Sequence, residues 1–191
     1  MEHSNMMIKR EKFSPLKLSS PKSIQSKNLT GSLRVVSDLV VDIHANVQHW
    51  HNFHHQGLGY IKDITQEKCK RDPENLQDLC DKLEKICDNL DNIVLRLEQI
   101  KNQLNTIRVL ERATDKLFIS WSPNKFCETA EILWTAFRKE AELKRNILAN
   151  VAHNHTDSWI LFNLTAWGHQ PFVSGYLNVL VESLLIETGH R

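Results

Sequence analysis

The chain has 191 residues, a formal net charge of +1 and 41% hydrophobic residues, enough for one domain with a buried core. Glycine (6) and proline (5) are scarce, and because both interrupt helices, their rarity favours an all-α fold over a turn-rich β fold. We find no apolar run long enough to cross a bilayer and no apolar signal-peptide core in residues 1–10, so we expect neither a membrane protein nor a secreted one.

Positive charge gathers in the first residues. Residues 1–34 hold seven basic and two acidic side chains, so their net charge is +5 and that of the remaining chain is −4. Residues 1–31 are rich in Ser, Lys and Pro and lack apolar periodicity, which predicts a disordered basic tail. Ser14 and Ser20 each precede a proline and are candidate phosphorylation sites. The acidic body is a poor phosphate binder, so direct nucleic-acid binding is not expected, although a nucleic-acid-binding module that uses the tail is kept as an alternative.

Apolar positions between residues 36 and 64 alternate in steps of four and three, which predicts one stripe along an α-helix. Gly57 and Gly59 interrupt the pattern, and two interpretations are open. Either the helix breaks at residues 55–60, or a glycine is kept where another backbone comes close. The stripe consists of Val36, Val40, Ile43, Val47, Trp50, His54, Gly57, Ile61 and Ile64.

The strongest periodicity follows, in a helix that Asp72 and Pro73 begin as cap and first residue. The short link before it lets it fold back on the preceding helix, so we predict a long antiparallel helical hairpin (coiled coil) over residues 32–112, about 50 Å long. Its flanking positions form no complementary charge code, which argues against a homodimeric zipper, but a self-associating structural coiled coil is kept as an alternative. The expected core is Trp50, Leu76, Leu79, Leu83, Ile86, Leu90, Ile93, Leu97, Ile100, Leu104 and Ile107.

Residues 118–191 predict a smaller C-terminal helical unit. Serine, aspartate and proline favour helix starts, whereas glycine favours helix ends. The expected helices run from Ser122-Pro123 to about His153, from an Asp157 cap to Gly168, and from about Val173 to Glu187, with Gly189 after the last.

No motif for catalysis is present: we find no nucleophile elbow, phosphate-binding loop, HExxH or paired-carboxylate pattern. We therefore expect no enzyme and no cofactor. Histidines cluster at residues 49–55 but have no cysteine or carboxylate at ligand spacing, so no metal site is expected. The four cysteines are interpreted as small packing residues.

Two groups of residues are candidates for partner binding. The basic residues of the 123–152 helix form either a polar face, in which Glu140 supports Lys144, or a ridge that faces a partner. The C-terminal residues are either an interface rich in aromatic side chains or the turn that closes a small core. The candidates are Arg138, Lys139, Lys144, Arg145, Trp167, His169, Gln170, Pro171, Phe172, Glu187, Thr188, Gly189, His190 and Arg191.

The order and spacing of several motifs resemble the cyclin-dependent-kinase-2-interacting protein family over residues 118–191. These motifs are Phe118-x-x-Trp121, the basic residues at 138–145, Trp-x-His-Gln-Pro-Phe at 167–172 and the closing Glu-Thr-Gly-His-Arg at 187–191. A looser likeness continues upstream at Trp50, Gly57 and residues 83–87.

The resemblance implies a non-enzymatic adaptor in the nucleus, with a cytoplasmic pool as well. It implies as partners cyclin-dependent and origin-firing kinases, the partner subunit of a checkpoint kinase, and AAA+ ATPases with a small companion protein. It further implies roles in DNA replication, replication-stress checkpoint signalling, replisome proteostasis and maturation of the large ribosomal subunit. The heptads add a mechanism, which is a stiff helical rod that presents a partner-binding surface.

Overall fold

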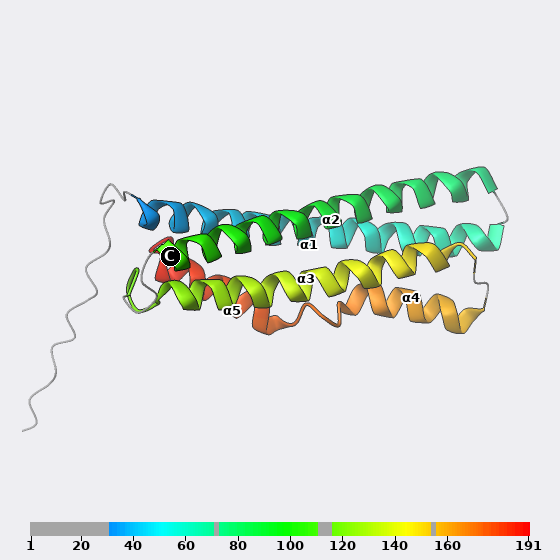
Figure 1. Ribbon diagram of the computed structural model, residues 1–191. Helices are drawn as coiled ribbons and strands as arrows, with labels where there is room; N and C mark the ends of the chain where they lie inside the picture. Colours follow the sequence, from blue (N-terminus) through cyan, green and yellow to red (C-terminus); the bar gives the residue numbers. More distant parts are fainter. Residues whose placement is uncertain (1–30, 71–72, 111–115, 154–155) are drawn as a thin grey trace, which may run out of the picture.

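The computed structural model describes residues 31–70, 73–110, 116–153 and 156–191. Over these residues it contains five helices and no strand, which confirms the all-α prediction (Figure 1). The helices are α1 (Ser32–Lys70), α2 (Pro73–Leu110), α3 (Pro123–Val151), α4 (Asp157–His169) and α5 (Gly175–Glu187). None of the described helices is long and apolar enough to cross a membrane. The basic tail with Ser14 and Ser20, and the predicted cap Asp72, lie outside the described residues.

The predicted hairpin is present, since α1 and α2 lie side by side in antiparallel directions (Figure 1). The heptad positions of α2 from Leu79 to Ile107 are buried, as is Trp50 of α1, while Leu76 is half-buried. Both α1 and α3 pack along α2 within the same chain. The apolar stripe of α2 is therefore covered and leaves no open seam for a second copy of this helix.

Helix α1 passes through both glycines without interruption, so of the two interpretations the break at residues 55–60 is wrong. Gly57 sits against the indole of Trp167, where an added Cβ would lie 2.2 Å from Cζ2. The alternative interpretation was correct that something approaches this glycine closely, but the neighbour is a side chain and not a backbone. Gly59 has nothing within 4 Å of an added Cβ.

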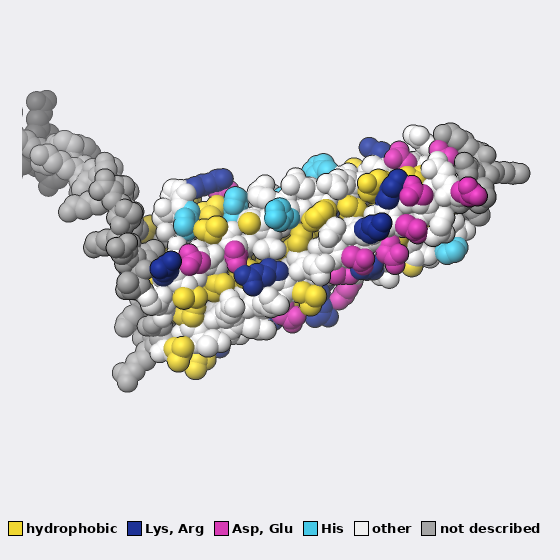
Figure 2. Space-filling view, turned by 90° about the horizontal axis from the view of Figure 1, so that it is seen from above, with side chains coloured by type: hydrophobic (Ala, Val, Ile, Leu, Met, Phe, Trp, Pro, Cys, Tyr) yellow, Lys and Arg dark blue, Asp and Glu magenta, His cyan; other side chains and the backbone are white. Residues whose placement is uncertain are grey.

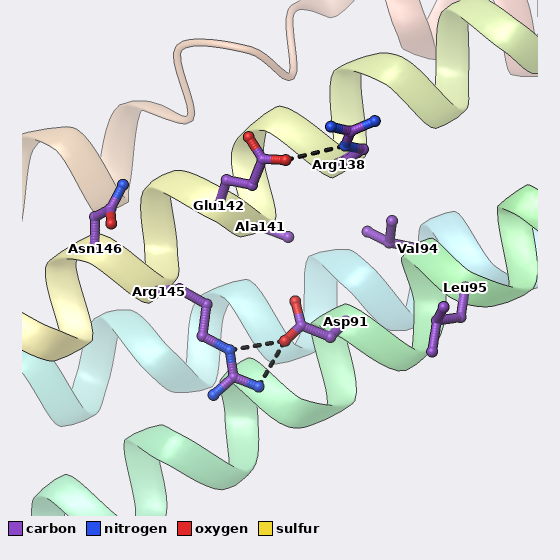
Figure 3. Close-up of a pocket in the computed structure, with 8 residues that line it drawn as sticks. All are labelled: Asp91, Val94, Leu95, Arg138, Ala141, Glu142, Arg145 and Asn146. Atoms are coloured by element: carbon purple, nitrogen blue, oxygen red, sulfur yellow. Dashed lines mark hydrogen bonds and ion pairs between the residues drawn. The ribbon is translucent and has the colours of Figure 1, made fainter.

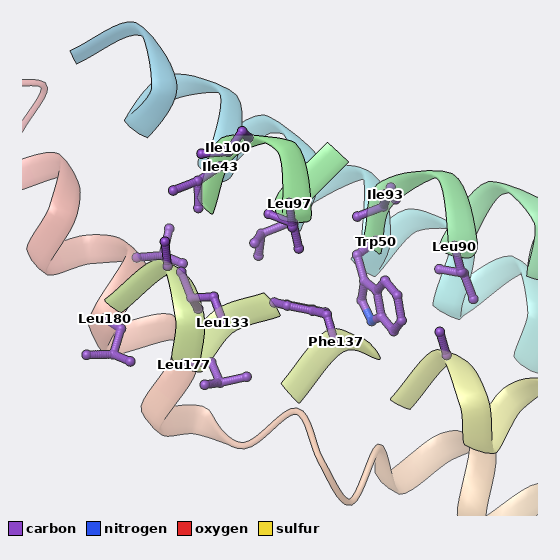
Figure 4. Close-up of a cluster of buried hydrophobic side chains, with 14 of the residues drawn as sticks. Ile43, Trp50, Leu90, Ile93, Leu97, Ile100, Leu133, Phe137, Leu177 and Leu180 are labelled. Carbon is purple, nitrogen blue, oxygen red and sulfur yellow. The ribbon is translucent and has the colours of Figure 1, made fainter. Parts of the chain in front are cut away.

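The three C-terminal helices pack onto the hairpin and complete a four-helix bundle. Helix α3 lies along α2, and α4 and α5 follow one another along the remaining position, in contact with α1 and α3 (Figure 1). Figure 4 shows Trp50, Leu97, Phe137 and Leu177, from α1, α2, α3 and α5, pointing into one shared core. Residues 118–191 thus share their hydrophobic core with the hairpin.

The helix ends differ from the predicted ends by one or two residues. Thr156 takes the N-cap position of α4, so Asp157 is its first helical residue and not its cap. The helix continues past Gly168 to His169, and Gln170 ends it in the left-handed conformation with φ of 45°. Ser122 and Pro123 begin α3 as predicted, and Gly189, with φ of 80°, follows α5 as predicted.

A candidate interaction groove between α2 and α3

The buried side of α3 includes two charged residues. Glu140 and Lys144 are fully buried and form an ion pair, with 3.1 Å between Oε1 and Nζ. The predicted i,i+4 pairing is therefore correct, but the predicted polar face is wrong for these two residues. Steps of four and three along the helix from Phe126 reach both residues. The spacing therefore already indicated that Glu140 and Lys144 lie on the buried side of the helix.

The buried lysine has further polar neighbours besides Glu140. Its Nζ donates to the backbone oxygen of Trp167 at 3.3 Å and to Nδ1 of His54 at 3.3 Å, and lies 4.2 Å from the centroid of the Trp167 ring. Burial lowers the pKa of Lys144, and the Glu140 carboxylate opposes this effect. Burial, assisted by the lysine charge, also lowers the pKa of His54 to about 3, so His54 is neutral and accepts through Nδ1.

The four basic candidates on α3 do not form one ridge. Lys144 is in the core, and Lys139 lies on the side of the helix that faces Phe172. Arg138 and Arg145 lie seven residues apart on the side that faces α2. The geometry therefore brings together two of the four candidates and separates the other two.

Arg138 and Arg145 line a groove of about 630 Å³ between α2 and α3 (Figure 3). Val94, Leu95 and Ala141 form the apolar part of its lining, and Leu95 is 55% exposed. The remaining lining residues are Asp91, Glu142 and Asn146. An apolar floor with a charged rim suits the side chains of a protein segment.

Ion pairs fix the rim of the groove. Arg145 bridges to α2, with Nη2 at 2.6 Å from Asp91 Oδ2 (Figure 3) and at 2.5 Å from Asp88 Oδ1. Partial burial opposes the charge of Arg145, but the two aspartates outweigh it and raise the pKa of this residue. Arg138 pairs with Glu142 within α3, at 3.0 Å between Nε and Oε1. Arg145 is thus held against a second helix, whereas the pair of Arg138 is exposed and lies within α3.

An aromatic residue with two cations extends this edge of α3. The centroid of the Trp134 ring lies 3.6 Å from Nζ of Lys101 and 5.3 Å from Cζ of Arg138. Its Nε1 is buried and has no hydrogen-bond partner among the described residues. Trp134 was not among the sequence candidates, because one half-buried tryptophan in an amphipathic helix gives no pattern of its own.

The turn between α4 and α5 is tied into the core. Trp167 is fully buried and donates from Nε1 to the backbone oxygen of His54 at 3.1 Å. Gln170 accepts from Nε1 of Trp50 at 2.8 Å, and the backbone N–H of Phe172 donates to Glu140 Oε2 at 3.1 Å. His169, Pro171 and the Phe172 side chain face outward. Trp167 and Gln170 therefore belong to a turn that closes the core, which was one of the two interpretations of this stretch.

The five closing residues also make contacts within the molecule. Glu187 is buried and accepts from the backbone N–H of Trp121 at 2.7 Å and from Ser120 Oγ at 2.9 Å, which fixes the segment before α3. Thr188 is buried and bonds back to α5. His190 Nε2 lies 2.9 Å from Oγ of Ser37 in α1. Gly189 is exposed, and Arg191 pairs with Glu182 on the surface. A partner-binding role for these residues stays a prediction.

The described residues offer no arrangement for metal chemistry. None of their His, Cys, Asp and Glu side chains form a group of three or more placed to hold an ion. Cys87 is buried, and burial raises the pKa of its thiol to about 12, as expected for a packing residue. On the face formed by α1 and α2, Figure 2 shows basic and acidic side chains next to one another, without a region of one charge sign.

Comparison with known proteins gives relatives of a single kind, although no family model matches the chain. The human cyclin-dependent kinase 2-interacting protein is 31% identical over 137 residues, which cover 68% of this chain and 65% of that protein. Its namesakes from Xenopus laevis and Mus musculus are 36% and 37% identical over 74 and 81 residues, or 39% and 42% of this chain. The chain spans 65% of the human relative and 36% and 38% of the other two. The resemblance is thereby confirmed, and the chain is a relative of the cyclin-dependent kinase 2-interacting proteins.

Proposed function

We propose that this chain is a non-enzymatic adaptor that binds a cyclin-dependent kinase through the groove between α2 and α3. The similarity to proteins named for an interaction with cyclin-dependent kinase 2 supports the choice of partner. The names of those relatives describe interacting proteins and not enzymes.

The observation that carries the choice of surface is the exposed Leu95 in the lining of the groove, together with the charged side chains of Arg138 and Arg145. Interfaces combine a desolvated apolar centre with a polar rim, and arginine is enriched in their energetic centres. A long bundle held by its own core provides a rigid support for such a groove.

The family resemblance extends the proposal to further partners. They are origin-firing kinases, the partner subunit of a checkpoint kinase, and AAA+ ATPases with a small companion protein. In this proposal the chain resides in the nucleus, with a cytoplasmic pool, and serves DNA replication, the replication-stress checkpoint, replisome proteostasis and maturation of the large ribosomal subunit. Recovery of these proteins by affinity purification from nuclear extract, with mass spectrometry, tests this extension.

Binding of purified cyclin-dependent kinase 2, with and without a cyclin, tests the kinase proposal directly. Leu95→Lys places a charge on the groove floor four residues after Asp91, where the helix tolerates a lysine well. We expect at least about a tenfold weaker association, which is about 1.4 kcal/mol. Val109→Lys is the matched control, because Val109 is an exposed residue of the same helix outside the groove.

The outcomes separate the two parts of the proposal. If the unaltered chain does not bind the kinase at physiological salt, the partner is wrong. If Leu95→Lys and Val109→Lys bind equally well, the kinase contacts another surface. Circular dichroism of each variant ensures that the comparison concerns folded protein.

A further inference from the structure

The groove between α2 and α3 adjoins an acidic side of α2. Positions 81, 84, 88, 91, 95 and 98 follow one another in steps of three and four, so their side chains share one side of the helix. Five of these six positions are acidic, and the sixth is the exposed leucine in the lining of the groove. We call this row the acidic stripe: Asp81, Glu84, Asp88, Asp91, Leu95 and Glu98.

Basic residues of the described chain match only part of this charge. Arg145 is the described residue that forms ion pairs with the acidic stripe, at Asp88 and Asp91. Residues 74–98 of α2 hold seven acidic and three basic side chains, so their net charge is −4. The side of α2 next to the groove therefore favours a segment with positive charge.

The first thirty residues of the same chain carry the opposite charge. Residues 1–30 hold six basic and two acidic side chains, so their net charge is +4. Residues 8–18, which we call the basic segment, contain four of the six basic residues and one acidic residue. Large apolar residues stand among these charges, so the segment complements an exposed leucine among carboxylates. They are Ile8, Phe13, Leu16 and Leu18.

The basic segment is long enough to reach the groove. Arg96 of α2 donates to Asp42 of α1, which sets these two residues level with one another in the antiparallel pair. The α2 lining of the groove precedes Arg96 by one to five residues, so it lies at most about 22 Å along α1 from Ser32. A path round one helix adds about 12 Å, and about eleven extended residues span the total. Eighteen positions separate Phe13 from Gly31.

We propose that the basic segment docks in the groove between α2 and α3 of its own chain, against Leu95 and the acidic stripe. A tether of this kind gives an effective concentration of about 1 mM, so a contact as weak as about 100 μM keeps the segment docked about nine-tenths of the time. The segment then covers the surface assigned above to the kinase, and this regulation rests on the proposed function. The kinase has to displace the segment, which weakens its apparent association about tenfold.

A photoreactive benzoylphenylalanine in place of Phe13 tests the docking in the full chain without any kinase. Irradiation at about 1 μM should join position 13 to the stretches of α2 and α3 that line the groove, as mapped by mass spectrometry. Leu95→Lys should lower the yield several-fold, because it places a positive charge where the segment binds. Val109→Lys is the matched control, since Val109 is exposed in the same helix outside the groove, and should leave the yield unchanged.

An equal mixture of isotopically labelled and unlabelled chains shows whose groove the segment enters. We expect each cross-link to join two peptides with the same label. Cross-links that join labelled to unlabelled peptides would place the segment on a second copy and overturn docking within one chain. The proposal also fails if position 13 forms no cross-link to the groove, or if folded Leu95→Lys forms as many as Val109→Lys.

Kinase binding tests the displacement with two variants that change the same charge at different places. Lys9→Glu with Lys12→Glu alters the basic segment, whereas Lys22→Glu with Lys27→Glu alters only the residues after it. The first pair should strengthen the apparent association up to about tenfold, and the second by less than about twofold. Equal affinities of the two double variants overturn the regulation. A kinase that binds none of the chains refutes the proposed function, while the cross-link still decides the docking.

Discussion

Replacement of Gly57 by alanine should destabilise the protein, although the same change in an open helix would stabilise it. Gly57 is an interior residue of α1, and alanine in such a position is favoured over glycine by about 1 kcal/mol. The Cβ of alanine would lie 2.2 Å from Cζ2 and 2.9 Å from Cε2 of Trp167. Carbon atoms in contact are about 3.5–4 Å apart, so the indole has to move by more than about 1 Å.

The indole is held in place both by burial and by a hydrogen bond. Trp167 is fully buried, and its Nε1 donates to the His54 backbone oxygen at 3.1 Å. Forcing a group into a packed core costs about 1–3 kcal/mol. Straining a buried hydrogen bond adds about 1 kcal/mol. After the gain of about 1 kcal/mol from the helix, we expect Gly57→Ala to lower the free energy of unfolding by about 1–3 kcal/mol.

Gly59→Ala is the matched control in the same helix, two residues later, because an added Cβ there meets nothing within 4 Å. It should raise the free energy of unfolding by up to about 1 kcal/mol. Urea unfolding followed by circular dichroism measures both values, and Tm should move in opposite directions by about 2–4 °C per kcal/mol. If Gly57→Ala proves as stable as Gly59→Ala, the indole does not pack against Gly57 and the docking of α4 on α1 is wrong.

Three further predictions concern buried residues. Leu90→Asp puts a charge on a fully buried position of α2 and should cost on the order of 5 kcal/mol, seen as loss of the cooperative thermal transition; an unchanged Tm would show that Leu90 is not buried. Lys144→Met should cost about 3–5 kcal/mol in urea unfolding because it leaves the Glu140 carboxylate buried without its cation, and adding Glu140→Gln should restore part of the loss; no restoration would mean that the two residues are not coupled. The folded-state pKa of His54, about 3, lies below its ordinary 6.5, so the stability that His54 contributes is complete above about pH 6.5 and is lost as the pH falls towards 3. Between pH 7.5 and 5.5 the free energy of unfolding of the unaltered chain should fall by about 1 kcal/mol more than that of His54→Gln. Equal losses would contradict a neutral buried His54.

The sequence predicted the hairpin well because each long helix repeats its pattern many times. The heptads of α2 span Leu76 to Ile107, so one atypical position changes little in the assignment. Helix ends rest on one or two residues each, and these were less well predicted. Thr156 and Asp157 are both good N-caps, and local chemistry does not decide between them.

The candidate site was predicted in part. Helix periodicity alone predicts that Arg138 and Arg145 lie on a different side from Lys144. Successive residues on a helix are about 100° apart, so Arg138 and Arg145 share a side with Glu142 and Lys144 does not. The groove itself depends on how α3 is rotated against α2. That rotation results from the fit of many core side chains at once, and no local pattern along the chain encodes it.

Long-range anchors escaped prediction for the same reason. Gly57 and Trp167 meet across 110 positions of the chain, and the bond of Glu187 to Trp121 joins the end of α5 to the start of α3. Each residue alone has a plain local interpretation, as a helix breaker, a core aromatic or a helix-end carboxylate. Their pairing exists only once the four helix positions of the bundle are filled.

The placement of the motif residues changes how binding experiments on this chain have to be designed. Trp167 and Glu187 hold α4, α5 and the segment before α3 in place, so Trp167→Ala, or a truncation that removes Glu187, disturbs the core together with any surface near it. Loss of a partner in such a variant is the expected result whether or not the partner touches these residues. Substitutions at exposed Leu95 and Val179 change a surface with little change in packing, because more than half of each residue is already in water. A comparison of these two sites therefore distinguishes a contact from a folding defect, which the more conspicuous motif residues do not.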